Sequence, residues 1–185
     1  LDAAGPASIE AAAAFVEKEF GKLDILVNNA GIFLDRGRPG IELDIATFRQ
    51  TMEVNLYGPF LLCQQFLPLI RKNGYGRIVN IGTVATPLKL EGEALYASSK
   101  AAVVSLTQIL AREFADFGIT VNALGPAPIE TDLIRSVPRD KLQRVLDRQA
   151  IHRFGKFSDV ANVIDFFIQP ASDFLTGQVI YLGGV

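Results

Sequence analysis

Hydrophobic residues form two different patterns along this chain. Short apolar runs, typical of strands buried on both faces of a parallel sheet, occupy residues 23–29, 76–82 and 119–124, and GQVIYLGG holds a fourth. Between these runs, apolar residues recur at the spacing of a helix. The predicted helices are residues 6–20, 44–72, about 94–117 and 158–168.

Glycines and prolines set the ends of these elements. A glycine ends each of the first three helices, and Ser158 is expected to cap the fourth. Pro68 lies inside the second helix, where it should bend the axis or remove one backbone hydrogen bond. Pro87 is assigned to a loop. Residues 126–138 contain three prolines, so we expect this segment to be irregular or broken by short helices.

The alternation of strands and helices predicts the fold class. The connections have the length needed for parallel strands with helices on both faces of the sheet. The sequence shows no internal repeat, low-complexity tract or linker. We therefore predict one α/β domain with a doubly wound parallel sheet.

Composition excludes several function classes. Apolar residues make up 49% of the 185 residues and charged residues 21%, which is too apolar for a disordered chain. The net charge of -2 and the lack of basic runs argue against nucleic acid or an anionic membrane as the partner. No apolar stretch is long enough to span a membrane. Cys63 and His152 are single, which excludes an internal disulfide and argues against a metal cluster, so we expect no metal and a reducing, cytoplasmic setting.

Tyr96 and Lys100, in YASSK, lie four residues apart on a predicted helix and share a face. A phenol with a pKa near ~10 is a poor acid-base group at neutral pH, and a nearby ammonium would lower that pKa. A general acid/base for alcohol–ketone chemistry needs such a phenol. Taken alone, the pair is a weak signal, because a surface pair on a helix is the commoner explanation.

Thr83 lies thirteen residues before Tyr96, just after a predicted strand. The carboxyl ends of parallel strands form the ligand crevice of an open α/β sheet, so this hydroxyl is a candidate to hold a substrate oxygen. The alternative is a threonine that only ends a strand and opens a loop.

Two asparagine features complete the pattern. In NNAG, residues 28–31, paired amides can bridge strand ends and the small residues allow a flat ligand to approach the backbone, although a simple turn explains the motif as well. Asn55 is polar within an apolar helix, so its amide must be paired. It is expected to bond a freed carbonyl or to position a water near Lys100, or else to tie two helices together.

Taken in order, NNAG, Asn55, Thr83 and Tyr96-x-x-x-Lys100 resemble the short-chain dehydrogenase/reductase family. The resemblance covers essentially the whole chain, including RIVNIGTVA, LYASSKAAV and ITVNALGPAPIETD. Within the family it looks most like the 3-oxoacyl-acyl-carrier-protein reductase type, while the opening LDAAGPASI also looks like the carbonyl reductase branch. It implies a Rossmann-like sheet and an oxidoreductase that moves a hydride between NAD or NADP and a carbonyl or alcohol, with a 3-oxoacyl thioester as a candidate substrate.

The resemblance also implies roles for individual residues. Tyr96 would be the general acid/base, with Lys100 lowering its pKa and binding the nicotinamide ribose. Thr83 would orient the substrate oxygen, and Asn55 would complete the tetrad. Besides Tyr96 and Lys100, the implied cofactor contacts are Asp2, Ala3, Asn29, Ala30, Gly31, Pro126, Ile129 and Thr131.

The chain departs from the family pattern at several places. Thr83 replaces the usual serine and adds a methyl group that stiffens the side chain. Ala127 replaces a glycine after Pro126, and Leu182 replaces an aspartate. By this resemblance the N-terminal strands, the glycine-rich turn that holds the pyrophosphate and the charged residue that selects NAD or NADP are absent. We therefore expect residues 1–185 to be a single, N-terminally incomplete domain.

Three further expectations remain open at this stage. Residues 128–146 are amphipathic and form either a helical excursion or, by the resemblance, a lid over the substrate. The family implies a homotetramer or homodimer that associates through the helices at 44–72 and 94–117. The departures at Thr83 and Ala127 and the absent cofactor loop leave room for a different class of function, a catalytically weak binding or scaffold protein on the same fold.

Overall fold

A computed structural model of the chain describes the backbone of residues 1–185 and every side chain except that of Asn73. Four parallel strands form one sheet in the order β1 (Ile25–Asn28), β2 (Gly76–Ile81), β3 (Ile119–Gly125) and β4 (Val179–Tyr181). The register aligns Asn28 of β1 with Asn80 of β2, and Asn80 with Ala123 of β3. All carboxyl ends therefore lie at one edge of the sheet, as the sequence predicts for this fold class.

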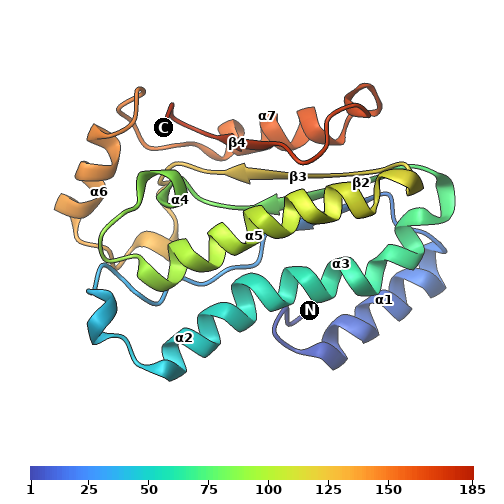
Figure 1. Cartoon of the computed structure of the whole chain (residues 1–185), viewed down its shortest axis with the longest axis horizontal. Helices are drawn as coiled ribbons and strands as arrows, with labels where there is room; N and C mark the ends of the chain where they lie inside the picture. The colour runs from blue at the N-terminus through green and yellow to red at the C-terminus, as the bar shows by residue number, and fades with distance from the viewer.

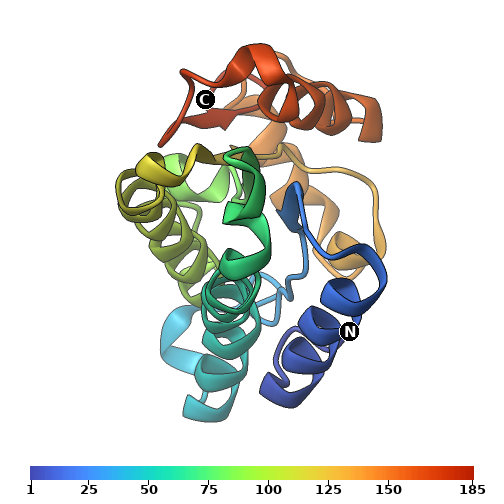
Figure 2. The same ribbon diagram turned by 90° about the vertical axis from the view of Figure 1, so that its right-hand side faces the viewer.

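Helices cover both faces of the sheet. The helices α3 (Gly58–Ile70) and α5 (Ala94–Glu113) pack on one face, and α1 (Pro6–Phe20) packs against α3. On the opposite face, α7 (Phe157–Ile168) packs on β2 and β3 (Figures 1 and 2). This arrangement confirms the α/β class. The remaining segments are α2 (Ile45–Met52), η1 (Gly40–Glu42), η2 (Glu53–Tyr57), η3 (Arg71–Asn73), α4 (Ala85–Leu88), η4 (Ala115–Phe117), η5 (Asp132–Ile134), α6 (Arg139–Asp147) and η6 (Pro170–Ser172).

The main core lies between the sheet and the helices α1, α3 and α5. Ile9 of α1, Ile70 of α3 and Ile78 of β2 are fully buried there, together with Val121 of β3. Apolar burial of this kind is the main force that holds such layers together. No helix among the described residues is both long and apolar enough to cross a membrane.

The edge strand differs from its prediction. The run at residues 23–29 was expected to be buried on both faces, but only Ile25–Asn28 forms a strand, and Ile25 and Val27 are each 37% exposed. The physical reason is position: β1 is the edge of the described sheet, and α7 covers β2 and β3 instead.

The predicted helix at 44–72 is one helical run made of different segments. After α2, the segment η2 (Glu53–Tyr57) is a π-helix, which inserts a wider turn before α3 begins. Pro68 is accommodated inside α3. The loop assigned to Pro87 is instead the short helix α4.

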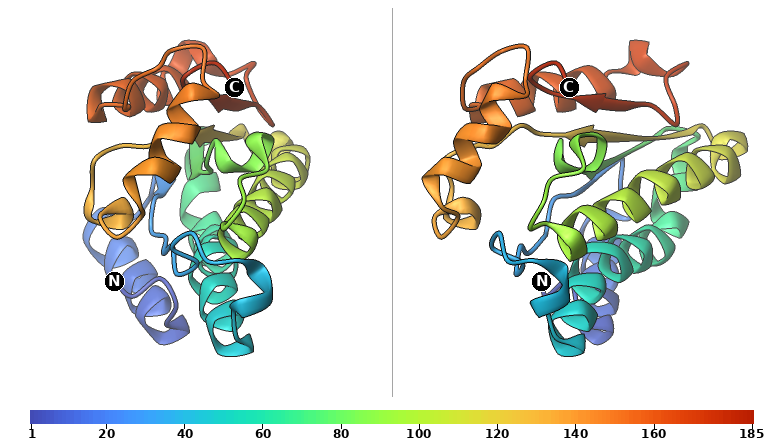
Figure 3. Two further views of the ribbon diagram at one scale, coloured as in Figure 1. Left: turned by 90° about the vertical axis from the view of Figure 1, so that its left-hand side faces the viewer. Right: turned by 60° about the vertical axis from the view of Figure 1, so that its left-hand side comes forward.

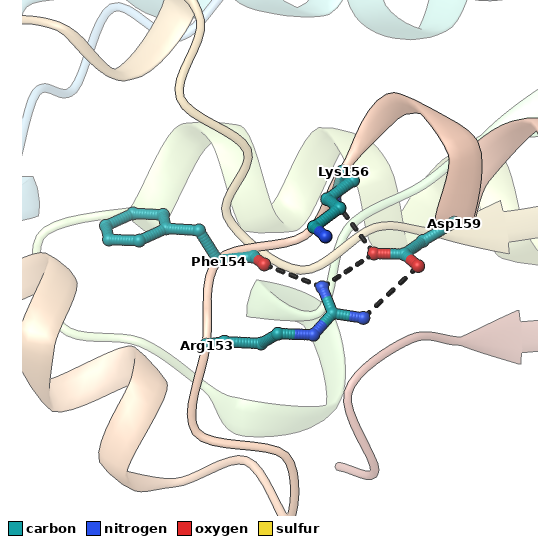
Figure 4. A network of polar contacts seen from close by, with 4 residues as sticks. All are labelled: Arg153, Phe154, Lys156 and Asp159. Carbon is teal, nitrogen blue, oxygen red and sulfur yellow. Dashed lines mark hydrogen bonds and ion pairs between the residues drawn. The ribbon is translucent and has the colours of Figure 1, made fainter.

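The start of α7 also differs from its prediction, because Ser158 is not its cap. The carboxylate of Asp159 accepts a hydrogen bond from the backbone N–H of Lys156 at 2.8 Å (Figure 4). The guanidinium of Arg153 donates to both carboxylate oxygens, at 2.8 Å and 3.2 Å, and to the carbonyl of Phe154. These charge-assisted bonds lower the pKa of Asp159 to about 2 and fix the chain where it enters α7.

Candidate active site

A buried polar chain fixes the ends of β1 and β2. The side-chain amide of Asn28 donates to Oδ1 of Asn80 at 2.8 Å, and the amide of Asn80 donates to the hydroxyl of Thr107 on α5 at the same distance. Thr107 in turn donates to the carbonyl of Val103. All three linked side chains are buried. The expectation that an asparagine of NNAG bridges strand ends is therefore confirmed for Asn28.

Asn55 ties the loop after β1 to α5. Its Oδ1 accepts the N–H of Ile32 at 2.8 Å, and its Nδ2 donates to the carbonyl of Ile32 at 2.9 Å and to Ser99 Oγ at 3.1 Å. The residue is fully buried and lies in the π-helix η2. Asn55 therefore bonds a backbone carbonyl, as one prediction had it. It also ties η2 to α5 through Ser99, which was the alternative prediction.

The first turn of α5 is held by a buried acid, Asp35. The carboxylate of Asp35 accepts the N–H of Leu95 at 2.7 Å and the N–H of Tyr96 at 3.2 Å. The N-terminus of a helix favours negative charge, and Asp35 is fully buried there. The backbone of Tyr96 is thus fixed from the loop that follows β1.

Lys100 lies one turn further along α5 and is 3% exposed. Its Nζ donates to the carbonyl of Ile81, the last residue of β2, at 2.8 Å. A Cβ at Gly31 would lie 3.3 Å from this Nζ, so the glycine leaves the ammonium open toward the loop after β1. The sequence pattern that places Lys100 four residues after Tyr96 thus puts its charge at the carboxyl ends of two strands.

Tyr96, Lys100 and Thr83 meet at one cavity of about 390 Å³. Thr83 follows β2, and its hydroxyl accepts the N–H of Ala85 at 3.2 Å while it faces the phenol of Tyr96. The ring of Tyr96 packs on Phe33, with 4.9 Å between ring centroids. A hydroxyl, a phenol and an ammonium therefore converge on one space.

The far wall of the cavity is apolar. It comes from residues 131–145, and its side chains include Leu133, Ile134, Val137, Leu142 and Val145. Figures 1 and 3 show α6 standing beyond the carboxyl ends of the strands, apart from the main layers. Two cations attach it: Lys141 donates to the carbonyl of Gly37, and Arg148 to the carbonyl of Leu88 at 2.5 Å.

Burial dominates the electrostatics of the site. It raises the pKa of Tyr96 to about 12, with the charge of Glu93 adding to the rise and a hydrogen bond with Thr83 opposing it. It lowers the pKa of Lys100 to about 8. The sequence predicted that Lys100 would lower the pKa of Tyr96. In the structure the pKa of Tyr96 is raised instead, because desolvation dominates and the groups that act on the phenol are Glu93 and Thr83, not Lys100.

The chain matches a known protein family over almost its whole length. A profile of the family described as Enoyl-(Acyl carrier protein) reductase matches residues 1–184. The chain belongs to the short-chain dehydrogenase/reductase family. It is 34% identical to the 3-oxoacyl-(acyl-carrier-protein) reductase FabG of Escherichia coli (strain K12) over 184 residues, which cover 100% of this chain and 75% of that protein.

Other relatives agree with this assignment. The reductase FabG of Staphylococcus epidermidis (strain RP62A) is 33% identical over 169 residues, covering 91% of this chain and 68% of the relative. A hydroxy(phenyl)methylsuccinyl-CoA dehydrogenase subunit, BbsD, of Thauera aromatica is 41% identical over 165 residues, covering 89% and 65%. As a short-chain dehydrogenase/reductase, the protein is a nicotinamide-dependent oxidoreductase that acts on CH–OH and C=O groups.

The residues present fit a nicotinamide cofactor at this edge of the sheet. A Cβ at Gly31 would close the space beside Lys100 Nζ and Asn55 Oδ1, at 3.3 Å and 3.5 Å, so the glycine keeps that space open. Asn29 is exposed on the cavity wall, where its amide is available to a polar ligand. A planar polar ligand at the carboxyl ends of parallel strands suits this set of donors and small residues.

The structure brings most of the predicted site residues together, but not all. Those that line the cavity are Asn29, Gly31, Thr83, Tyr96, Lys100, Pro126, Ile129 and Thr131. Asn55 lies directly behind it, through Ile32 and Ser99. Asp2, Ala3 and Ala30 are not among the lining residues. Asp2 accepts the N–H of Ala4, and the carbonyl of Ala3 would be 2.4 Å from a Cβ at Gly58.

Two residues of this site were missed by the sequence interpretation. Asp35 lies in a loop that reads as polar, and no spacing rule links it to Tyr96, 61 residues later. Glu93 lines the cavity directly before α5. Its only signal was its place three residues before Tyr96, at the position that precedes the helix.

Proposed function

We propose that this protein reduces the ketone of a 3-oxoacyl thioester, with Tyr96 as the proton donor. The observation that carries the proposal is the convergence of Thr83, Tyr96 and Lys100 on one cavity. The relatives named as 3-oxoacyl reductases support the substrate class, and the apolar wall from residues 131–145 suits an acyl chain.

A nicotinamide cofactor, when bound, supplies the hydride. Lys100 and Asn29 would hold its ribose, and Gly31, Pro126, Ile129 and Thr131 would line its nicotinamide side. The catalytic tetrad of the proposal is Asn55, Thr83, Tyr96 and Lys100. The choice between NADH and NADPH is left to the experiment.

Thr83, Tyr96 and Lys100 each have a separate role in the reduction of the carbonyl. The hydroxyl of Thr83 donates to the ketone oxygen and holds it beside the phenol of Tyr96. As the carbonyl carbon is reduced, negative charge develops on that oxygen, and the phenol proton passes to it to give the alcohol. The ammonium of Lys100 stabilises the phenolate that remains, which then recovers a proton from solvent.

The pKa of Tyr96 favours this direction of reaction. A phenol with a pKa of about 12 is fully protonated at neutral pH and ready to donate to an alkoxide, which is a stronger base. Lys100, with a pKa of about 8, keeps its charge below that pH. We therefore expect reduction to be fast near neutral pH and to slow as the pH rises through about 8, because Lys100 then loses its charge.

The test compares turnover with binding. The purified protein is mixed with NADPH or NADH and a panel of ketones and 3-oxoacyl thioesters, and cofactor oxidation is followed by absorbance, while calorimetry measures cofactor binding. The proposal predicts oxidation that depends on the ketone. Cofactor binding without turnover on any carbonyl would instead favour the weakly catalytic binding or scaffold protein on this fold, for which the substitutions at Thr83 and Ala127 argue.

A further inference from the structure

Glu93 is the acidic residue that lines the cavity. It lies directly before the first turn of α5, three residues before Tyr96. Its carboxyl has no hydrogen bond or ion pair to the described side chains or backbone, and it does not cap its own helix. A partly buried acid without a partner is uncommon, because desolvation of its charge is uncompensated.

Asp35 explains why Glu93 is unpaired. The backbone N–H groups at the start of α5 that would stabilise a carboxylate are taken by Asp35, which accepts from Leu95 and Tyr96. Burial and the nearby charge of Asp35 raise the pKa of Glu93 to about 7. The two acids thus place negative charge at this end of the cavity, and neither forms an ion pair with a described side chain.

The positive end of the site lies elsewhere along the same helix. Lys100 is seven residues after Glu93, which is about 10 Å along a helix axis, with Tyr96 between them. Lys100 faces Gly31 and the carbonyl of Ile81, on the side proposed for the cofactor. Glu93 therefore lies toward the remaining space, where the substituents of the substrate must be placed.

The surroundings make this charge effective. The same cavity is also lined by the apolar side chains of Phe33, Ile134, Val137 and Leu142. Charges next to apolar side chains interact more strongly than in water, so a second negative charge brought into this space is disfavoured.

We propose that Glu93 selects substrates by charge, so that the cavity accepts neutral 3-oxoacyl derivatives and rejects free 3-oxo acids. This inference rests on the proposed function, because it concerns groups attached next to the ketone that Tyr96 would protonate. In a free 3-oxo acid the carboxylate is one methylene from that ketone, and the proposal places it on the Glu93 side of the cavity. In an ester or thioester the same position is neutral.

The test compares two forms of one ketone, a neutral ester and the negatively charged free acid. Values of kcat/KM are measured for ethyl acetoacetate and acetoacetate, at pH 6 and pH 8, with wild-type protein and Glu93→Gln. Glu91→Gln is the matched control, since Glu91 is exposed in the same loop and does not line the cavity. The titratable groups that line the cavity are Glu93, Tyr96 and Lys100, and Asp35 and Lys141 lie just behind it.

The expected result is a change in the ratio of the two kcat/KM values. At pH 8, Glu93→Gln should lower the preference for ester over acid about 10-fold, the effect of one unfavourable charge pair at a few ångströms. In the wild type the preference should increase several-fold from pH 6 to pH 8, and in Glu93→Gln it should increase less, because only the titration of Lys100 remains. Glu91→Gln should behave as the wild type.

A second readout does not depend on turnover. Binding of 3-hydroxybutyrate, which has the same charge next to the alcohol, is measured by calorimetry with cofactor present, and Glu93→Gln should bind it about 10-fold more tightly at pH 8. If Glu93→Gln keeps both the wild-type ratio and the wild-type affinity, the inference is wrong while the proposed function stands. If no carbonyl is reduced although the affinity changes as expected, the proposed function is wrong and the charge selection remains.

Discussion

The α5 wall of the cavity is polar and tied to its neighbours by buried hydrogen bonds, whereas the α6 wall is apolar and is held by packing of side chains such as Leu142 and by bonds of Lys141 and Arg148. On the α5 side, Asp35 and Asn55 fix the backbone and the loop behind Tyr96. On the α6 side, the bonds of Lys141 and Arg148 to backbone carbonyls hold the helix over the site. The first wall suits proton transfer, which needs fixed geometry, and the second suits recognition of variable apolar groups.

Removing a polar group from the α5 side should have the larger effects. Thr83→Val keeps the shape of the side chain and loses only the hydroxyl. We expect kcat/KM for a ketone to fall by about 100- to 1000-fold, the usual cost of one lost donor to a developing oxyanion. Thr83→Ser, which keeps the hydroxyl, is the control. Equal activity of Thr83→Val and wild type in a steady-state assay would show that this hydroxyl does not hold the substrate.

The substitution Lys100→Met should lower activity and raise stability. We expect kcat/KM to fall by about 100-fold, because the phenolate of Tyr96 loses its charge partner. Stability should change in the opposite direction. Burial lowers the pKa of Lys100 from 10.5 to about 8, so below pH 8 the folded state carries a desolvated ammonium at a cost on the order of 3 kcal/mol, partly offset by its bond to Ile81.

The stability of the wild type depends on pH because Lys100 binds its proton less tightly in the folded state than in the unfolded chain. Between pH 8 and 10.5 the unfolded chain holds the proton that folded Lys100 has lost, so wild-type stability increases with pH in that window. Lys100→Met should therefore be more stable than wild type by about 1–2 kcal/mol at pH 7, and the difference should shrink above pH 8. Urea unfolding at pH 7 and pH 10 measures both values, and a less stable Lys100→Met at pH 7 would refute this account of the buried charge.

A change in the apolar wall should act mainly on binding. Leu142 is buried on α6 and packs against Phe33 and Val137. We expect Leu142→Ala to raise KM for a long-chain 3-oxoacyl thioester by about 10-fold, through lost apolar contact, and to change kcat by less than about threefold. Leu133→Ala, on the more exposed part of the same wall, is the comparison. A kcat loss as large as that of Thr83→Val would mean that both walls serve the chemistry.

Glu93 lines the cavity at the start of α5 and should have the smallest effect on stability. Its pKa is raised from 4.5 to about 7, so the folded state binds a proton that the unfolded chain has lost between these values. Stability should therefore decrease as pH rises from 4.5 through 7, by about 1 kcal/mol after allowing for its partial exposure. Thermal unfolding of Glu93→Gln should lack this slope. If the stability of both proteins falls equally between pH 4.5 and 7, a group other than Glu93 titrates in this range.

The contrast between the walls also explains what the sequence could predict. Strands and helices followed from periodicity, and Tyr96, Lys100, Thr83 and Asn55 followed from spacing, because local geometry places them. The predicted membership of the short-chain dehydrogenase/reductase family is confirmed over residues 1–184. The π-helix around Asn55 and the short helix at Pro87 were missed, since both depend on packing rather than on local propensity.

Other features required the fold itself. Asp35 reaches α5 from a loop 61 residues away, which no pattern in the chain indicates. Arg153 fixes the entry to α7 through Asp159, a contact that depends on the path of the chain between them (Figure 4). The direction of the pKa of Tyr96 depends on how completely the phenol is buried, and spacing alone cannot give that balance.

The central claim is that Tyr96 donates the proton, and its most direct test is the single-turnover rate of Tyr96→Phe. The protein is saturated with the reduced cofactor, mixed rapidly with a ketone at pH 7, and cofactor oxidation is followed by fluorescence. Tyr75→Phe is the control, because that phenol bonds the carbonyl of Ile168 and does not line the cavity. We predict a rate at least about 1000-fold below wild type for Tyr96→Phe and a near-normal rate for Tyr75→Phe. A wild-type rate in Tyr96→Phe would contradict the account.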